Sequence, residues 1–387
     1  MIPKIVTVFL MLAFVLYAQK VLPPPSGCYI GCFGSGGAAN FKALTGKDLA
    51  IDMQFFNFNS TFPSSFANNA VQNGLVPYIA WEPWDGNVNG TKFSNQSIID
   101  GAHDAYLKTF AAASKQFAKP LFIRFGHEMN GNWYSWDGTH SGGATTTGYG
   151  DQAKADGPER YVDAYRRVWQ VFKDGGVTNV TWIWCPNSDA VPGQAWNDMA
   201  NYYPGDQYVD WVGVDGYNFG SVQGAWRRFS NIYSTPYSKA IKYNKPMLIG
   251  EFASGESGGD KAAWITECFT LLKTTFPKIQ AFTWFNINKE TDWRINSSAA
   301  AQSAFRTAMS DAYYVGKITL FGDLTSSAIN PSVRNKLPAM AILPVETIEL
   351  RKGGIVVKNA GKRYLVSGER VSETLFLHFD WNRATTR

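Results

Sequence analysis

The chain has 387 residues, of which 45% are hydrophobic, 15% aromatic and 17% charged. This composition excludes a largely disordered chain, because disordered segments are depleted in apolar and aromatic residues. The formal net charge is +5, yet Lys and Arg balance Asp and Glu at 25 each through Tyr314, so the whole excess lies beyond that residue. The absence of net charge through Tyr314 argues against nucleic acid or another polyanion as the substrate of this protein.

The first residues have the pattern of a secretory signal peptide. Lys4 supplies the positive charge, Ile5–Tyr17 is apolar, and we expect cleavage after Ala18. The apolar run is shorter than the roughly 20 residues that span a bilayer. An uncleaved anchor is the alternative. We therefore expect a signal peptide at 1–18, a Pro-rich linker at 19–26, and a secreted monomer with no membrane association after cleavage.

Export would permit disulfide bonds among the four Cys residues of the chain. Cys28 and Cys32 fall on one predicted strand, where about 3.3 Å per residue separates their ends by roughly 13 Å. That span is too long for a bridge between these two residues, and the pairing otherwise stays open.

Short apolar runs follow the linker, each trailed by a longer amphipathic stretch. They predict strands at Tyr29–Phe33, Leu49–Phe56, Val76–Trp81, Leu121–Phe125, Val180–Trp184, Trp211–Val214, Met247–Gly250 and Ala281–Trp284. Helical periodicity lies between them, at Ile98–Phe117, Lys261–Phe276, Ala299–Tyr313 and after Asp156, where Tyr161, Tyr165, Val168, Trp169 and Phe172 share one face. Strand and helix units over 27–314 predict an α/β fold, a (β/α)₈ TIM barrel. A doubly wound open sheet is the alternative, although no Gly-rich phosphate-binding turn follows the first strand.

From about Val315 the sequence changes to Lys- and Arg-bearing stretches of β type, at Thr347–Lys352, Gly354–Lys358 and Thr374–Phe379. They predict a small C-terminal β-rich extension at 315–387. It is either an accessory β-region or a poorly ordered extension, its role is open, and it offers no candidate site residue.

The most informative segment runs from Leu121 to Trp136. An apolar strand leads directly into His127, Glu128 and Asn130, at the C-terminal end of a barrel strand, where the active sites of such barrels lie. The zinc-protease motif H-E-x-x-H is excluded because Gly131 occupies its last position. With four His residues in the chain, we expect no histidine-based metal site and no cofactor.

A second carboxylate has the same setting, because Glu251 follows the seventh predicted strand. Strands four and seven lie on opposite sides of a closed barrel of eight strands, so Glu128 and Glu251 can face one another across its mouth. Glycoside hydrolysis uses two such carboxyl groups, one protonated and one ionised. The alternative for either Glu is a simple ion pair with Arg124 or Lys289.

Six tryptophans fall at or just after predicted strand ends, where a flat ring can stack on a sugar: Trp81, Trp84, Trp133, Trp136, Trp284 and Trp293. Any one of them could instead pack in the core or in a loop. Their accumulation at one rim favours a carbohydrate site.

These motifs resemble glycoside hydrolase family 26, whose members are retaining endo-β-glycanases. The longest match is Arg124-Phe-Gly-His127-Glu128-Met-Asn130-Gly-x-Trp133. Shorter matches over Gly27–Tyr314 are Trp81-Glu-Pro-Trp84, Asp215-Gly-Tyr217, Ile249-Gly-Glu251-Phe and Trp284-Phe-Asn, with Lys289-Glu-x-Asp-Trp-Arg294 after it.

The resemblance implies a role for each matching residue. Glu128 would be the general acid/base and Glu251 the nucleophile. The implied substrate-binding residues are Trp81, Arg124, His127, Asn130, Trp133, Tyr217 and Trp284. Among these, Tyr217 would donate a hydrogen bond to Glu251, Arg124 would orient the constellation, and Trp284 and Trp133 would form the sugar platforms before and after the cleaved bond.

We predict a retaining endo-β-glycosidase that hydrolyses β-1,4 bonds in a β-glucan with mixed 1,3 and 1,4 linkages. An endo-β-1,4-mannanase with the same mechanism is the first alternative. Mannan-cleaving members tend to have Trp followed by His at the third strand, whereas Trp81 is followed by Glu82 here. A catalytically silent sugar-binding barrel and a metal-dependent deacetylase-like enzyme are the alternatives from other classes; the first would lose one carboxylate, and the second would need a cluster of His and Asp.

Overall fold

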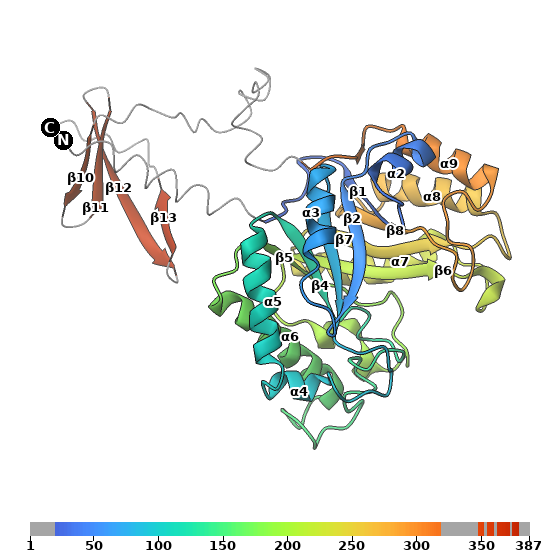
Figure 1. The fold of residues 1–387 in the computed structure, drawn as a ribbon, viewed down its shortest axis with the longest axis horizontal. Coiled ribbons are helices and arrows are strands. Elements are labelled where there is room, and N and C mark those ends of the chain that lie inside the picture. Colours follow the sequence, from blue (N-terminus) through green and yellow to red (C-terminus); the bar gives the residue numbers. More distant parts are fainter. Residues whose placement is uncertain (1–19, 319–346, 352–353, 360–361, 372–373, 379–387) are drawn as a thin grey trace. The chain divides into compact units, whose positions relative to one another are not determined.

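The computed structural model describes residues 20–318 and, beyond them, residues 347–351, 354–359, 362–371 and 374–378. In the first range, parallel strands close into a barrel in chain order, with β1 paired to both β2 and β8 (Figure 1). The barrel strands are β1 Cys28–Phe33, β2 Ile51–Asn57, β3 Val76–Glu82, β4 Leu121–Phe125, β5 Val180–Trp184, β6 Trp211–Asn218, β7 Met247–Ser254 and β8 Ile279–Phe285. The predicted (β/α)₈ barrel is confirmed, and its closure excludes the open-sheet alternative.

The connecting helices are α2 Ala38–Thr45, α3 Ser64–Gln72, α4 Asn95–Ile99, α5 Asp104–Phe117, α6 Asp156–Asp174, α7 Phe229–Ala240, α8 Lys261–Thr274 and α9 Ala299–Met309. The predicted helix at Ile98–Phe117 is in fact two, because Gly101 adopts a left-handed φ of 80° between α4 and α5. A short strand β9, Tyr314–Val315, pairs with the start of β1 next to the closed barrel. No helix of the described residues is long and apolar enough to cross a membrane.

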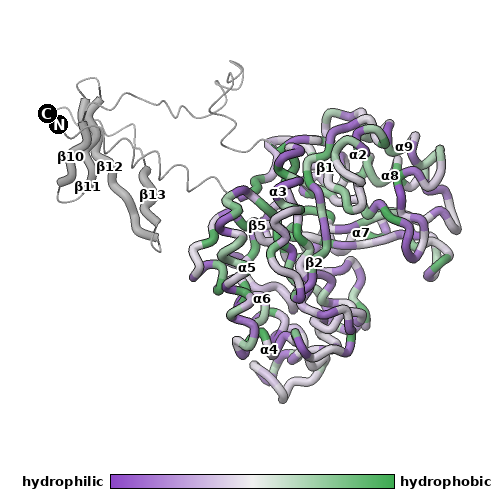
Figure 2. Tube along the Cα trace, in the orientation of Figure 1, coloured by the Kyte–Doolittle hydropathy of each residue, from purple (hydrophilic) through white to green (hydrophobic). Residues whose placement is uncertain are grey.

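Alternate residues of each strand enter two separate apolar clusters, as expected for strands with one face inside a barrel and one under the helices. The interior cluster includes Tyr29, Ile51, Met53, Val76, Tyr78, Phe122, Ile183, Trp211, Leu248 and Ala281. Their neighbours along the strands pack against the helices, whose apolar (green) stretches alternate with hydrophilic (purple) ones in Figure 2.

The segment just before β1 docks on the barrel. Val21 is 2% exposed and belongs to the interior cluster, together with Ile318 from the end of the first described range. The Val21 backbone N–H donates to Thr181 Oγ1 at 2.8 Å, and the Val21 carbonyl accepts from Trp211 Nε1 at 3.0 Å. This part of the predicted linker therefore packs on the barrel. The predicted signal peptide lies outside the described residues.

The C-terminal region contains a separate antiparallel sheet in the order β10-β11-β12-β13. Its strands are β10 Thr347–Arg351, β11 Gly354–Asn359, β12 Lys362–Val371 and β13 Thr374–His378. The predicted strands correspond to β10, β11 and β13. We missed β12 because its sequence combines several charged residues with a Gly, all of which weaken the strand signal.

The docking of Val21 can be tested by Val21→Asp. Burying an unpaired carboxylate in the apolar end of the barrel should lower the free energy of unfolding by about 3 kcal/mol, measured by urea denaturation. Leu22→Asp is the matched control, because Leu22 is 57% exposed and should change stability by no more than about 0.5 kcal/mol. Equal effects of the two substitutions would show that this segment does not pack on the barrel.

Candidate active site

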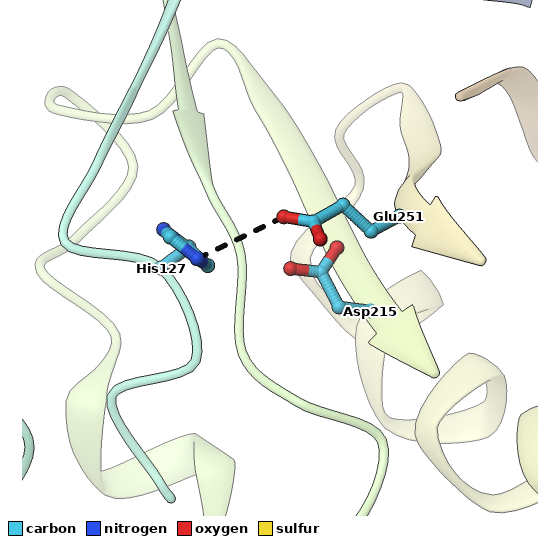
Figure 3. Close-up of side chains that lie close together, drawn as sticks. All are labelled: His127, Asp215 and Glu251. Carbon is cyan, nitrogen blue, oxygen red and sulfur yellow. Dashed lines mark ion pairs between the residues drawn. The ribbon is translucent and has the colours of Figure 1, made fainter. Parts of the chain in front are cut away.

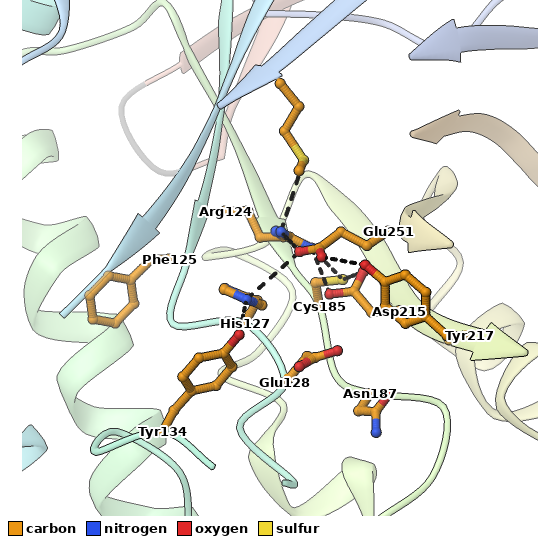
Figure 4. A network of polar contacts seen from close by, with 12 residues as sticks. Arg124, Phe125, His127, Glu128, Tyr134, Cys185, Asn187, Asp215, Tyr217 and Glu251 are labelled. Atoms are coloured by element: carbon orange, nitrogen blue, oxygen red, sulfur yellow. Dashed lines mark hydrogen bonds and ion pairs between the residues drawn. The ribbon is translucent and has the colours of Figure 1, made fainter. Parts of the chain in front are cut away.

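A polar layer lies above the apolar interior, at the C-terminal ends of the strands. It is built from Arg124 on β4, Cys185 after β5, Asp215 on β6 and Glu251 on β7, all less than 9% exposed (Figure 4). Each strand supplies its polar group where the interior face reaches the mouth of the barrel. This is the end of the barrel at which sites of this fold form.

Glu251 points into the barrel because β7 is irregular at that position. Leu248 belongs to the interior cluster, while Ile249 and Phe252 pack on the helix side. Strict alternation would send Glu251 outward, but the pairing of β7 with β8 shifts register between Ile249 and Phe252. Such bulges re-aim side chains next to active sites, and here the bulge turns a carboxylate inward.

Arg124 holds this carboxylate in place. Its side chain is fully buried, its Nη1 donates to Asp215 Oδ2 at 2.6 Å, and its Nη2 donates to Glu251 Oε1. The other oxygen of Glu251, Oε2, accepts from the Tyr217 hydroxyl at 2.7 Å. The predicted bond from Tyr217 and the orienting contact of Arg124 are both present, and together they fix the two oxygens of Glu251.

Gly250 makes room for this arrangement. A Cβ atom at this position would lie 2.4 Å from Asp215 Oδ1, 2.7 Å from Arg124 Nη1 and 2.8 Å from Cys185 Sγ. Any side chain would therefore force the network apart. The buried ion pairs of Arg124 therefore require a glycine immediately before Glu251.

Glu128 lies on a tight turn after β4. Its φ is 53°, in the left-handed region that non-glycine residues rarely adopt, a kind of strain that clusters at functional sites. The turn is held because the Glu128 N–H donates to the Cys185 carbonyl at 2.8 Å and the Glu128 carbonyl accepts from Gly131 N–H at 2.8 Å. Its Oε2 accepts from Trp133 Nε1 at 2.8 Å.

The environment of Glu128 favours its neutral form. Burial raises the pKa of its carboxyl group well above the usual value, and the negative charges of Asp215 and Glu251 raise it further. Glu251, in contrast, accepts hydrogen bonds from the cationic Arg124 and from Tyr217, which stabilise a negative charge on it. The site thus provides a proton donor and a carboxylate side by side in chemically different surroundings.

His127 is fully buried between these groups. Its Nε2 lies 3.2 Å from the Tyr134 hydroxyl and 3.7 Å from Glu251 Oε1. Burial lowers the pKa of the imidazole well below its usual value, and the nearby charges of Arg124 and Lys289 lower it further. His127 is therefore neutral at pH 7 and acts as a hydrogen-bonding group.

Three potential metal ligands converge here, since His127, Asp215 and Glu251 offer atoms within 4.8 Å of one another (Figure 3). Arg124 already supplies a positive charge to both carboxylates of this group. A divalent cation would have to displace a buried guanidinium from its two ion pairs. The donor set fits an arginine-centred network better than a metal site.

Four of the six tryptophans expected at the rim are at most 1% exposed: Trp81, Trp136, Trp284 and Trp293. Trp81 is fully buried and stacks on Phe110 of α5 with ring centroids 4.1 Å apart. Trp284 is equally buried on the helix side of β8, where its Nε1 donates to the Trp293 carbonyl at 2.9 Å. Both residues are one position away from the interior face of their strands, so a sugar in the barrel mouth cannot reach them.

The Asn130 side chain is bonded to the backbone of the loop after β5. Its Nδ2 donates to the Asn187 carbonyl at 2.9 Å, and its Oδ1 accepts from the Asn187 N–H at 2.8 Å. The side chain is 1% exposed and joins the loop after β4 to the loop after β5. Trp133, by contrast, is partly exposed beside Glu128, as expected for a platform next to the acid.

We missed an aromatic wall that does line the mouth. Phe33, Phe55 and Phe285 come from β1, β2 and β8, with Phe33 4.9 Å from both of the others between ring centroids. The ring of Tyr217 lies 5.6 Å from Phe285. The strand periodicity could have revealed these residues, because Phe33 and Phe55 continue the interior positions Tyr29 and Met53.

Sequence reasoning also missed Cys185 as part of the site. Its thiol donates to Asp215 Oδ1 at 3.1 Å, and its carbonyl anchors the turn of Glu128. All four Cys residues are buried free thiols in this structure. The predicted separation of Cys28 and Cys32 agrees with this, and no disulfide forms among the four.

Comparison with known proteins assigns the chain to a family. The family model of glycosyl hydrolase family 26 matches residues 61–311. Endoglucanase H of Acetivibrio thermocellus is 37% identical over 289 residues, covering 73% of this chain and 30% of that protein. A mannan endo-1,4-beta-mannosidase of Bacillus subtilis is 26% identical over 219 residues, covering 54% of this chain and 51% of the relative.

The fold has close counterparts among solved structures. A Cellulomonas fimi endo-beta-1,4-mannanase double mutant aligns over 92% of this chain and 89% of its own, with a TM-score of 0.58 and 17% identity. The chain spans between about a third and a half of the length of the two sequence relatives. The family match over the barrel and the two glutamates at its mouth lead to one assignment: the chain belongs to glycosyl hydrolase family 26.

Proposed function

We propose that the protein is a retaining endo-β-glycosidase that hydrolyses β-1,4 bonds in mixed-linkage 1,3-1,4 β-glucan. The observation that carries this proposal is the pair Glu128 and Glu251, which come from opposite sides of the barrel and have opposite electrostatic surroundings. Double displacement needs one carboxyl group that gives a proton and one that attacks carbon.

In the first step, a Glu251 oxygen attacks the anomeric carbon while Glu128 protonates the departing glycosidic oxygen. The product is a covalent ester of the sugar with Glu251, and Glu128 is left as a carboxylate. Its charge is then stabilised by the Trp133 N–H, which donates to Oε2. In the second step, Glu128 takes a proton from water, the water oxygen attacks the anomeric carbon, and Glu251 is released with the β configuration retained.

The choice of glucan is supported by the relatives. The 37% identical relative is named an endoglucanase, while the mannosidase is 26% identical and a beta-1,3-xylanase of Vibrio sp is 22% identical. An endo-β-1,4-mannanase is the second candidate, favoured by the fold similarity to mannanases. A silent sugar-binding barrel is disfavoured because both glutamates are present and oriented.

The cellular setting is a separate part of the proposal. The N-terminal sequence Met1–Ala18 has the features of a secretory signal. We propose that the protein acts as a secreted monomer after removal of residues 1–18.

The role of Glu251 is tested by Glu251→Ala. Hydrolysis should be abolished, and added azide should restore part of it while forming an α-glycosyl azide, because the anion attacks from the face that the carboxylate occupied. Product NMR distinguishes the two anomers, and a β-azide would assign the nucleophile to Glu128 instead. Glu267→Ala is the control and should retain full activity, because Glu267 lies on helix α8 and pairs with Arg228, outside the site.

The role of Glu128 is tested by Glu128→Ala with two leaving groups. Loss of the acid should reduce polysaccharide hydrolysis by about 10³-fold, within the range for general acid catalysis. The first step with a dinitrophenyl glycoside should be nearly unchanged, because that phenolate leaves without a proton. Pre-steady-state release of the phenol measures this step, and similar losses on both substrates would remove Glu128 from the acid role.

The pH profile tests the contact between Trp133 and Glu128. The indole N–H stabilises the charged form of Glu128 and so lowers its pKa. Trp133→Phe should therefore raise this pKa and shift the basic limb of kcat/KM, where Glu128 loses its proton, to higher pH. Trp169→Phe, which alters a tryptophan packed on Tyr208 outside the barrel, should leave the limb unchanged. A basic limb that stays in place or moves to lower pH in Trp133→Phe would contradict this assignment.

The substrate is tested by initial rates on barley-type β-glucan and on unbranched mannan. We expect faster hydrolysis of the β-glucan. A clear preference for mannan would replace the proposed substrate and leave the two-glutamate mechanism intact.

A further inference from the structure

One carboxylate at the barrel mouth has no part in the mechanism described above. Glu82 is the last residue of β3, and the interior positions of that strand are Val76 and Tyr78. Because side chains alternate along a strand, Glu82 continues the interior face, while its neighbour Trp81 points toward the helices. Glu82 therefore lies at the mouth of the barrel, the end at which Glu128 and Glu251 also lie.

The side chain of Glu82 is fixed on one side only. Its Oε2 accepts from Trp84 Nε1 at 3.1 Å, and the Trp84 ring packs edge-on against Tyr134 with centroids 5.1 Å apart. Tyr134 in turn contacts His127. The other oxygen of Glu82, Oε1, has no hydrogen bond or ion pair with the described residues. An oriented carboxylate with a spare acceptor atom is suited to bind a hydroxyl group.

The charge of Glu251 acts on Glu82. Burial raises its pKa to about 7, and the charge of Glu251 contributes to this rise, while Trp84, Arg124 and Lys289 oppose it. The charges of Glu251 and Arg124 therefore affect the pKa of Glu82. The Glu82 carboxyl group is partly desolvated here, and no cation lies at ion-pair distance from it among the described residues.

We propose that Glu82 Oε1 accepts a hydrogen bond from a ring hydroxyl of the sugar whose anomeric carbon Glu251 attacks, and so helps to select the configuration of that sugar. This inference rests on the proposed function. Glucose and mannose differ only in the orientation of one hydroxyl, and a polar group left unpaired by the wrong epimer discriminates between them.

The experiment combines substitutions of Glu82 in the protein with removal of single hydroxyl groups from the substrate. Wild type, Glu82→Ala and Glu82→Gln are assayed on dinitrophenyl β-cellobioside and on three analogues lacking the 2-, 3- or 6-hydroxyl of the sugar attached to the phenol. At pH 8, where a carboxyl group with a pKa of about 7 is mostly ionised, Glu82→Ala should lower kcat/KM on the parent by roughly tenfold to a hundredfold, the range for a hydrogen bond to a charged group. On one deoxy analogue the loss should shrink to about twofold or less.

Glu82→Gln distinguishes a hydrogen bond to the substrate from a purely structural role of the side chain. Gln retains an oxygen for the Trp84 N–H and nearly the same shape, so a purely structural role would leave kcat/KM unchanged on all four substrates. If Glu82 binds the hydroxyl, the loss of charge should lower kcat/KM on the parent and spare the same analogue as Glu82→Ala. Asp85→Asn, an exposed neighbour that accepts from the Asn87 N–H, is the matched control and should have no effect.

Equal losses on all four substrates, or no loss in Glu82→Gln, would overturn the proposal. Failure of the proposed function would appear differently, since wild type would then reject the cellobioside and hydrolyse the corresponding mannobioside. The same experiment on deoxy mannobiosides would in that case still test whether Glu82 contacts a hydroxyl.

Discussion

The buried guanidinium of Arg124 is the interaction on which the site depends. It is fully inaccessible to solvent and lies between Asp215 and Glu251, so one cation joins β4 to the neighbouring strands β6 and β7. Burying these charges is costly, and removal of one partner from such a group typically destabilises a protein by about 3–5 kcal/mol. The cost is offset by close hydrogen bonds, by the thiol of Cys185 on Asp215 and by the room that Gly250 leaves.

The same network keeps the two glutamates chemically distinct. Glu251 faces the positive charge of Arg124 and the hydroxyl of Tyr217, whereas Glu128 has one neutral donor, Trp133, and negative neighbours. A barrel of parallel strands brings such residues together from distant parts of the sequence, because every strand ends at the same rim. The difference in surroundings, rather than the two carboxyl groups alone, favours acid and nucleophile roles.

Much of this could be predicted from the sequence, because the strands of a parallel barrel are short apolar runs and polar residues at their ends stand out. Glu128 and Glu251 were selected as candidates in this way, and the structure places both at the mouth of the barrel. The positions of Trp81 and Trp284 could not be predicted, since proximity to a strand end does not say which face a side chain occupies. The bulge that turns Glu251 inward has no simple sequence signal either, and it depends on the contacts of β7 with β8. The bonds of Asn130 to the Asn187 backbone could not be predicted either, because Asn187 becomes adjacent only in the folded chain.

The central claim is that Glu251 forms a covalent bond with the sugar. It can be measured directly by incubating the protein with dinitrophenyl 2-deoxy-2-fluoro-β-cellobioside, which slows both steps but retains a good leaving group, and by mapping the adduct with peptide mass spectrometry. We expect one fluorocellobiosyl group per chain, attached to Glu251. An adduct on Glu128 or another residue would contradict it, as would turnover of the natural substrate with inversion and no adduct at all.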